Sequence, residues 1–253
     1  GRAVFFNGTS EQIINLGKDV TMAYVFVEPN AKVTLASGNT LTITNFTINN
    51  SGTFLNDGTL NTSSVYVKQT LGDNRNWWYL SSPLSAASSS IFGTDKVGKY
   101  IEDYENDENA LTTAPYYTSP FGTAENLTPG RGYVVKRAST TEATYTFTGG
   151  NLNNGDVSAT VTRTGTTAAK RGFNLVGNPY PSYINWDLVY DAASTQNLNN
   201  AIWFRTKSGS EMAFHTYSDG DGVPDVANSK IAPMQAFWVK AENSPAALTF
   251  KNT

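Results

Sequence analysis

The 253-residue sequence contains no cysteine and only one histidine, His215. These two scarcities exclude disulfide bonds, cysteine nucleophiles, cysteine-ligated metal centres and any site that needs several imidazole ligands. Basic residues are also few, since 18 Lys and Arg stand against 21 Asp and Glu and leave a net charge of −3. Sequence-independent binding to nucleic acid needs a basic stripe that displaces counterions, so we expect no nucleic-acid partner.

Long apolar segments are missing as well. No run of about 18 apolar residues occurs, so no segment is predicted to span a membrane. The sequence opens on Gly1 rather than Met and lacks a basic start followed by an apolar stretch. We therefore expect a piece of a larger protein from which any export signal has been removed, and as an excised piece we expect it to be a monomer.

Neutral polar residues dominate, with 32 Thr and 26 Asn beside 21 Gly. Thr suits strands, whereas Asn and Gly suit turns. Short alternating segments such as residues 33–35, 145–147 and 157–161 are separated by turn residues. The pattern predicts an all-β protein, whose one short helix candidate is residues 187–193 behind Asn185 as a cap.

Residues 1–71 form a first predicted unit. They repeat a turn residue, a Thr and an apolar residue, as in residues 38–43, 52–55 and 58–60. Stacked coils of a β-solenoid show this pattern, because one apolar position in each short strand points into a shared core. The alternative is an ordinary twisted sheet with Thr on its solvent-exposed face.

Residues 72–253 form the second predicted unit, and it contains an internal duplication. Three pairs of segments resemble each other in the same order, at separations of 95, 104 and 103 residues: 78–83 with 173–179, 127–136 with 231–240, and 145–147 with 248–250. We predict a duplicated β-sandwich-type domain with halves at about 77–149 and 172–252 and a hydrophobic seam between them. Leu80 and Leu175 are expected to be equivalent and buried.

Residues 172–182, Gly-Phe-Asn-Leu-Val-Gly-Asn-Pro-Tyr-Pro-Ser, with Ile184-Asn-Trp186 behind them, resemble a segment of large secreted surface proteins of the Bacteroidetes type. Residues 78–83 and 127–133 match companion motifs of those proteins. The resemblance implies a module near the C-terminus of an exported, adhesin-like chain, commonly followed by a sorting domain for type IX secretion. No sorting domain is expected within this chain, and the resemblance supplies no catalytic residue.

Asp219, Asp221 and Asp225 form the sharpest candidate metal site. They lie in Asp-Gly-Asp-Gly-Val-Pro-Asp, where three carboxylates surround turn glycines. Ca²⁺ takes six to eight oxygen ligands from such loops, and the segment resembles half of a thrombospondin type-3 calcium repeat. Tyr217 stands where that repeat has a further acid. A hairpin turn uses the same residue types, so a Ca²⁺ site and a hairpin turn without a metal remain alternatives. No other cofactor is expected.

Two enzyme hypotheses are weaker. Residues 102–108 hold five carboxylates that can supply a glycosidase-like acid pair or bind a cation, but such a run is usually a solvated loop. His215 lies in a strand-like segment, and no Gly-x-Ser-x-Gly nucleophile elbow occurs. We therefore expect a non-enzymatic module.

Aromatic residues offer the last candidate site, because flat rings stack on the apolar faces of sugars. The duplication pairs Trp78 with Phe173 and places Trp238 at a position that is apolar in both halves, which predicts core. Trp77, Tyr116 and Tyr117 remain as candidate glycan-stacking residues. The function expected is a structural or adhesion module of a secreted or cell-surface bacterial protein that contacts an extracellular glycan or protein surface. The alternative is a carbohydrate-binding module of a glycan-degrading secreted protein.

Overall fold

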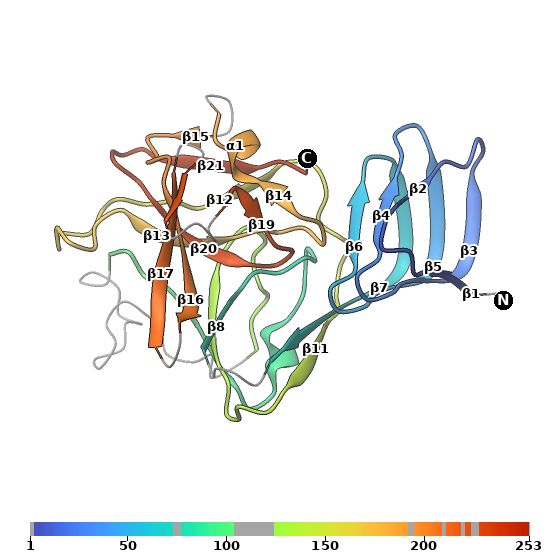
Figure 1. The fold of residues 1–253 in the computed structure, drawn as a ribbon, viewed down its shortest axis with the longest axis horizontal. Helices are drawn as coiled ribbons and strands as arrows, with labels where there is room; N and C mark the ends of the chain where they lie inside the picture. Colours follow the sequence, from blue (N-terminus) through green and yellow to red (C-terminus); the bar gives the residue numbers. More distant parts are fainter. Residues whose placement is uncertain are drawn as a thin grey trace.

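The computed structural model describes residues 3–72, 77–103, 124–191, 195–208, 211–218, 221–223 and 228–252. Strands make up 51% of the chain and helices 4%, which confirms the all-β prediction. A narrow N-terminal part, blue in Figure 1, stands beside a broader body that contains the rest of the described chain. Long strands at the base of the narrow part connect the two.

The N-terminal part is solenoid-like, as one of the two sequence alternatives proposed. Two sheets of parallel strands face each other and are joined coil by coil. In the first sheet Val20 faces Leu41, and Leu41 faces Leu60, so one coil takes 21 residues and the next takes 19. The strands are β1 (Ala3–Phe6), β3 (Val20–Val27), β5 (Thr40–Ile48) and β7 (Thr59–Leu71) in one sheet, and β2 (Glu11–Ile14), β4 (Lys32–Leu35) and β6 (Thr53–Asn56) in the other.

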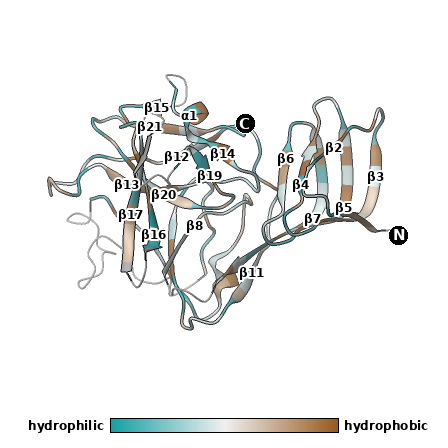
Figure 2. Cartoon of the chain, in the orientation of Figure 1, coloured by the Kyte–Doolittle hydropathy of each residue, from teal (hydrophilic) through white to brown (hydrophobic). Residues whose placement is uncertain are grey.

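Alternation along these strands builds the solenoid core. Leu41 and Ile43 are fully buried, whereas Thr40 and Thr42 between them are only partly buried. Figure 2 shows the matching bands of high and low hydropathy along β5. Thr therefore occupies the outer face of a sheet whose inner face is apolar, which explains the Gly-Thr-Leu pattern of the sequence.

The glycine of these units is needed because neighbouring coils approach closely at the turns. A β-carbon on Gly58 would lie 2.7 Å from the Asn39 carbonyl oxygen and 2.8 Å from that of Ala36. Both atoms belong to the backbone and cannot rotate away. Only glycine fits at this position, so the repeat has a steric cause.

Both solenoid sheets meet the rest of the chain at β6 and β7. Strand β11 (Ala143–Phe147) pairs antiparallel with β7, and the Phe54 amide of β6 donates to the Pro181 carbonyl at 2.9 Å. Buried Arg137 donates to the Leu71 and Gly72 carbonyls at 3.1 and 2.8 Å. One hydrophobic cluster continues from the solenoid into the next segment, so the boundary between residues 71 and 72 stays a prediction.

The remaining elements form the broader body. Its two main sheets are β8 (Trp77–Leu80), β10 (Tyr133–Lys136) and β9 (Lys96–Lys99), and β13 (Phe173–Gly177), β20 (Ala236–Lys240), β16 (Ile202–Ser208), β17 (Glu211–Ser218) and β18 (Asp221–Val223). Smaller sheets join β12 (Val157–Ala159), β21 (Ala247–Phe250) and β15 (Thr195–Gln196), and β14 (Ile184–Asn185) and β19 (Lys230–Ile231). The helical segments are η1 (Ser89–Phe92) and α1 (Trp186–Val189), the latter capped by the Asn185 side chain.

The two main sheets share their central geometry. Strand β10 lies between β8 and β9, as β20 lies between β13 and β16, and all four pairings are antiparallel. Two reciprocal bridges join the sheets, Leu80 with Gln235 and Val176 with Arg131. These bridges make Leu80 equivalent to Val176, one residue beyond Leu175. Leu80 and Leu175 are both buried, at 6% exposure.

The side chains of the broader body pack into separate apolar clusters. The outer face of the larger sheet contributes Phe204, Phe237 and Val239 to one cluster. The inner face contributes Leu175 and Trp238 to another, where they meet Val134 of β10 and Tyr100, the residue after β9. We call this second cluster the seam, because residues of both sheets form it. Among the described residues, no helix has the length and apolar character needed to cross a bilayer.

Candidate functional site

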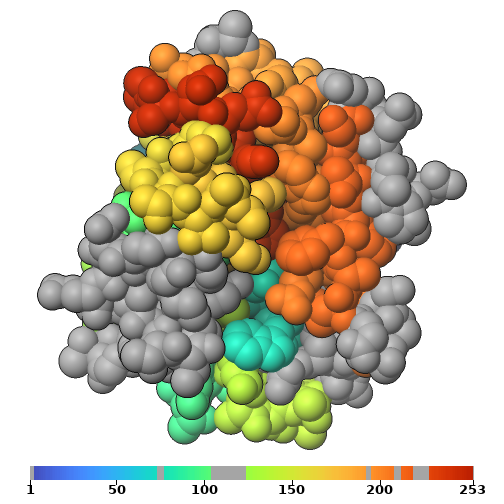
Figure 3. Space-filling view, turned by 90° about the vertical axis from the view of Figure 1, so that its left-hand side faces the viewer, coloured from blue at the N-terminus to red at the C-terminus, as the bar shows by residue number. Residues whose placement is uncertain are grey.

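A pocket of about 590 Å³ opens at the exposed end of the seam. Figure 3 shows this face of the molecule hollowed between the yellow segment that precedes β13 and the orange β16–β17 hairpin. Six aromatic residues line it: Tyr79, Tyr100, Phe173, Trp203, Phe214 and Trp238. Ala169, Lys170, Arg205 and Thr216 complete the described lining. We call this cavity the seam pocket.

Strand alternation explains how one sheet supplies most of the pocket. Trp203 faces Trp238 on one side and Thr216 on the other, while Arg205 faces Phe214. Because side chains two residues apart point to the same face, Trp203 and Arg205 lie together on the inner face of the sheet. The alternate residues Ile202 and Phe204 are buried in the opposite cluster.

Trp238 forms the floor of the pocket. The Tyr100 ring meets it edge to face with centroids 4.5 Å apart, and Tyr79 does so at 5.9 Å. Phe173 and Trp203 form a second edge-to-face pair at 5.3 Å. Such contacts fix the orientation of neighbouring rings, so the floor and walls are a preformed aromatic surface.

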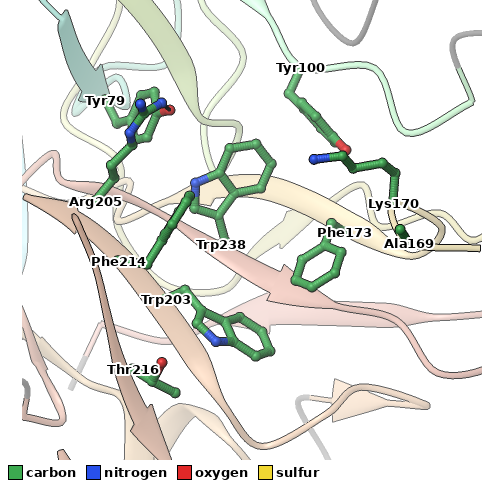
Figure 4. Close-up of a pocket in the computed structure, with 10 residues that line it drawn as sticks. All are labelled: Tyr79, Tyr100, Ala169, Lys170, Phe173, Trp203, Arg205, Phe214, Thr216 and Trp238. Carbon is green, nitrogen blue, oxygen red and sulfur yellow. Dashed lines mark hydrogen bonds between the residues drawn. The ribbon is translucent and has the colours of Figure 1, made fainter. Parts of the chain in front are cut away.

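The rim is exposed and cationic. Figure 4 shows Arg205 beside Tyr79 at one side of Trp238, and Lys170 beside Tyr100 at the other. The Arg205 guanidinium donates to the Tyr79 hydroxyl at 3.1 Å and lies 5.8 Å from the centre of the Phe214 ring. Phe214 is 55% exposed, so its ring projects from the rim into solvent.

One polar atom of the floor is unsatisfied. The indole nitrogen Nε1 of Trp238 is buried and has no hydrogen-bond partner among the described residues. Leaving a buried donor without a partner costs about 1–3 kcal/mol. A donor kept in this state beside a cavity is a candidate ligand contact.

Glu102 secures one wall of the pocket. Its buried carboxylate accepts hydrogen bonds from the amides of Thr164, Gly165 and Gly172, the last at 2.6 Å. These residues flank the segment that carries Ala169 and Lys170. Burial alone raises the pKa of Glu102, but the hydrogen bonds outweigh it and the pKa lies below its ordinary value. Glu102 is therefore a structural anchor and does not follow the solvated-loop expectation for residues 102–108.

None of the three predicted glycan-stacking residues is found in the described lining of the pocket. Trp77 lies outside the pocket lining, is 43% exposed and has the Lys136 ammonium 5.1 Å from its ring centre. It shares a face of β8 with Tyr79, so it lies on the surface that leads to the pocket. Tyr116 and Tyr117 lie outside the described residues.

Trp238 was interpreted as core, and it is 7% exposed, yet one part of it lines the seam pocket. The duplication indicated burial and carried no information about a neighbouring cavity. A different signal was present in the alternation of β16 and β17. It places Trp203 with Arg205, and Phe214 with Thr216, on one face, and such a mixture of aromatic and polar groups is unusual for a plain core face.

The structure leaves the calcium prediction untested. Asp219 and Asp225 lie outside the described residues, and of Asp221 only the backbone, in β18, is described. Within the described part of the chain, no group of three or more His, Asp or Glu side chains is arranged to hold a metal ion.

His215 lies away from the seam pocket. It belongs to the face of β17 opposite Phe214 and Thr216, and its Nε2 is 3.2 Å from the Thr206 hydroxyl of β16. Among the described residues, neither a Ser hydroxyl nor a carboxylate forms a hydrogen bond with it.

The motif that resembles secreted surface proteins has a structural role here. Asn178 is fully buried, accepts from the Tyr180 amide at 2.9 Å and donates to the Ser182 carbonyl at 2.8 Å. The Tyr180 hydroxyl donates to the Phe250 carbonyl at 2.9 Å, and burial raises its pKa well above the ordinary value. Pro181 accepts from β6, so the motif fastens the C-terminal half onto the solenoid.

Comparisons with known proteins place the chain in a family. No curated protein and no solved structure matches it. The model of one domain family matches residues 2–253, almost the whole sequence. The chain therefore belongs to DUF8693, a family of domains of unknown function.

Proposed function

We propose that this chain is a non-enzymatic adhesion module of a secreted or cell-surface bacterial protein, and that it binds a glycan in the seam pocket. The aromatic pocket is the single observation that carries the proposal. Ligand sites are typically concave, mostly apolar and furnished with a few directed polar groups. The seam pocket has these features, with six rings around a volume of about 590 Å³.

Sugar rings suit this lining. A pyranose has flat C–H faces that stack on aromatic rings and a polar edge that needs hydrogen-bond partners. Trp203 and Phe214 supply ring surface near the opening, while Arg205 and Thr216 supply polar contacts next to them. Because the ring contacts on the floor are already formed, little order has to be created when a ligand binds.

The placement at a cell surface rests on the resemblance of residues 172–182 to exported adhesin-like proteins. The solenoid-like N-terminal part supports it, since stacked coils make an extended stalk that holds a binding domain away from its attachment point. We include type IX secretion of the parent protein in this proposal.

A glycan microarray tests the proposal, with Phe214→Ala as the decisive variant. Phe214 is 55% exposed, so its removal should leave the fold intact while weakening binding about fivefold, equal to about 1 kcal/mol. Phe5→Ala is the matched control, since Phe5 is 57% exposed and lies on the solenoid. Equal binding by the two variants, or no glycan bound by the wild type, contradicts the proposal.

Trp77 provides a second measurement. If the bound glycan extends along the face of β8, Trp77→Ala weakens binding of oligosaccharides but leaves binding of monosaccharides unchanged. Its thermal stability should fall only slightly, because an exposed cation–π contact contributes about 0.5–1 kcal/mol.

A further inference from the structure

We infer that the seam pocket selects saccharides that carry an oxyanion, either a carboxylate or a sulfate. The inference rests on the proposed glycan-binding function and adds the charge of the ligand to it. It follows from three properties of the lining: its charge, its hydrogen-bonding character and the positions of its cations.

The described lining is cationic. It contains Arg205 and Lys170 and no Asp or Glu. A third cation lies next to it, because the Lys240 ammonium is 5.2 Å from the centre of the Phe173 ring. Cations in a concave site with apolar walls attract anionic ligands and raise their local concentration.

The charged and indole groups of the pocket are donors only. Arg, Lys and Trp side chains donate and have no acceptor, whereas the hydroxyls of Tyr79, Tyr100 and Thr216 can donate or accept. The buried Trp238 Nε1 adds a donor that has no partner among the described residues. A neutral sugar presents hydroxyl groups that also need acceptors, whereas a carboxylate or sulfate accepts only. Oxyanions therefore match this set of donors better than uncharged hydroxyls do.

The cations are placed to meet substituents at the edge of a stacked ring. Figure 4 shows Arg205 and Lys170 on opposite sides of the Trp238 indole. A sugar ring over this floor directs its equatorial substituents outward, toward one or the other cation. The hydrogen bond from Arg205 to Tyr79 holds the guanidinium at the rim, so less side-chain entropy is lost when an anion binds.

Calorimetric titration of the whole chain tests the inference with two matched ligand pairs. Oligogalacturonides and their methyl esters share a backbone and differ in the carboxylate charge. Dextran sulfate and dextran differ in the sulfate. We expect the charged member of at least one pair to bind about tenfold more tightly, and the pair that responds identifies the oxyanion.

The variant for this test is Arg205→Gln. It should weaken binding of the charged ligand about threefold more than binding of the neutral partner, because only the charged ligand loses an ion pair. Lys18→Gln is the matched control, because Lys18 is exposed on the solenoid and far from the lining. Raising NaCl from about 0.05 M to about 0.5 M should weaken binding of the charged ligand without any mutation.

The outcomes separate the two proposals. Equal or tighter binding of the neutral members, with Phe214→Ala still weakening it, overturns the charge selectivity and leaves glycan binding intact. Binding of charged ligands that Arg205→Gln and Lys18→Gln weaken equally overturns the assignment to this pocket. If neither these ligands nor any glycan of the array binds, both proposals fall.

Discussion

The ammonium nitrogen of Lys240 lies 5.2 Å from the centre of the Phe173 ring, across the β13–β20 strand pair. Lys136 and Trp77 repeat the arrangement at 5.1 Å across β8 and β10. Each lysine directly faces its aromatic residue in the register, so the two pairs occupy equivalent places in the two main sheets.

The equivalence has different consequences in the two sheets. Phe173 is a wall of the seam pocket, whereas Trp77 lies outside the lining and is 43% exposed. The larger sheet extends beyond β16, the counterpart of β9, by strands β17 and β18. Phe214 of the additional strand β17, together with Arg205 of β16, forms the rim, so a cavity is enclosed beside Phe173 and not beside Trp77.

Gly132 lies at a close contact between the two sheets. A β-carbon there would lie 2.6 Å from Leu175 Cγ and 2.8 Å from the Val176 carbonyl oxygen. We expect Gly132→Ala to lower the free energy of unfolding by about 2 kcal/mol, because overpacking must displace backbone. Urea denaturation measures the loss. Gly72→Ala is the control, since a β-carbon at Gly72 meets nothing within 4 Å, and a similar loss in both variants would refute the steric cause.

Asn178 is predicted to distinguish amide from carboxylate. Its Nδ2 donates to the carbonyls of Ser182 and Ala232 at 2.8 and 3.0 Å. Asn178→Ala should cost about 2 kcal/mol through lost hydrogen bonds. Asn178→Asp should cost more at pH 7, because a carboxylate oxygen then faces carbonyl oxygens. The additional destabilisation of Asn178→Asp relative to Asn178→Ala should become smaller as pH falls and the carboxyl group gains a proton. Thermal melts at several pH values measure this difference, and a difference that does not change with pH would count against this role.

Glu102 should make stability depend on acid pH. Its pKa in the folded state lies below the ordinary value of 4.5, so folding favours the charged form. The stabilisation is present above the unfolded-state pKa and is lost as pH falls through the folded-state pKa. We expect Glu102→Gln to lose about 2 kcal/mol at pH 7 and to approach the wild type in acid.

The matched control for Glu102→Gln is Glu11→Gln. The Glu11 carboxylate is exposed and accepts a hydrogen bond from the Thr34 hydroxyl. Glu11→Gln should change stability by less than about 0.5 kcal/mol at either pH. Since Glu102 anchors a pocket wall, Glu102→Gln should also weaken glycan binding at pH 7. A stable variant with unchanged binding would remove Glu102 from the support of the pocket.

Calcium binding at Asp219, Asp221 and Asp225 stays a prediction of the sequence. Three carboxylates in one loop repel each other, and Ca²⁺ would relieve this repulsion. We expect weak binding heat at about millimolar calcium, reversed by chelator, and none for Asp221→Ala. If the wild type gives no binding heat, the segment is a hairpin turn that does not bind calcium.

Much of the fold could be predicted from the local pattern of apolar and polar residues in the sequence. The alternation of Thr with apolar residues predicted strands, because it depends on which face of one strand is buried. The Gly-Thr-Leu units left solenoid coils and a twisted sheet as alternatives, and the structure is solenoid-like. The helix at α1 begins behind Asn185 as the cap predicted, although it ends at Val189 rather than at residue 193. The predicted register of the repeat was wrong by one residue, because motif alignment equated Leu80 with Leu175 whereas the bridges equate Leu80 with Val176.

Sequence alone was enough for the all-β class, for the buried and solvent-exposed faces of the strands, and for the function classes excluded by the lack of cysteine, the single histidine and the few basic residues. The position of the cavity depends on tertiary packing. Tyr79 comes from one sheet and Tyr100 from the residue that follows its strand β9, whereas Trp203, Phe214 and Trp238 come from the other sheet. No local period records how two sheet faces meet, because a pocket is the space left where their packing is incomplete.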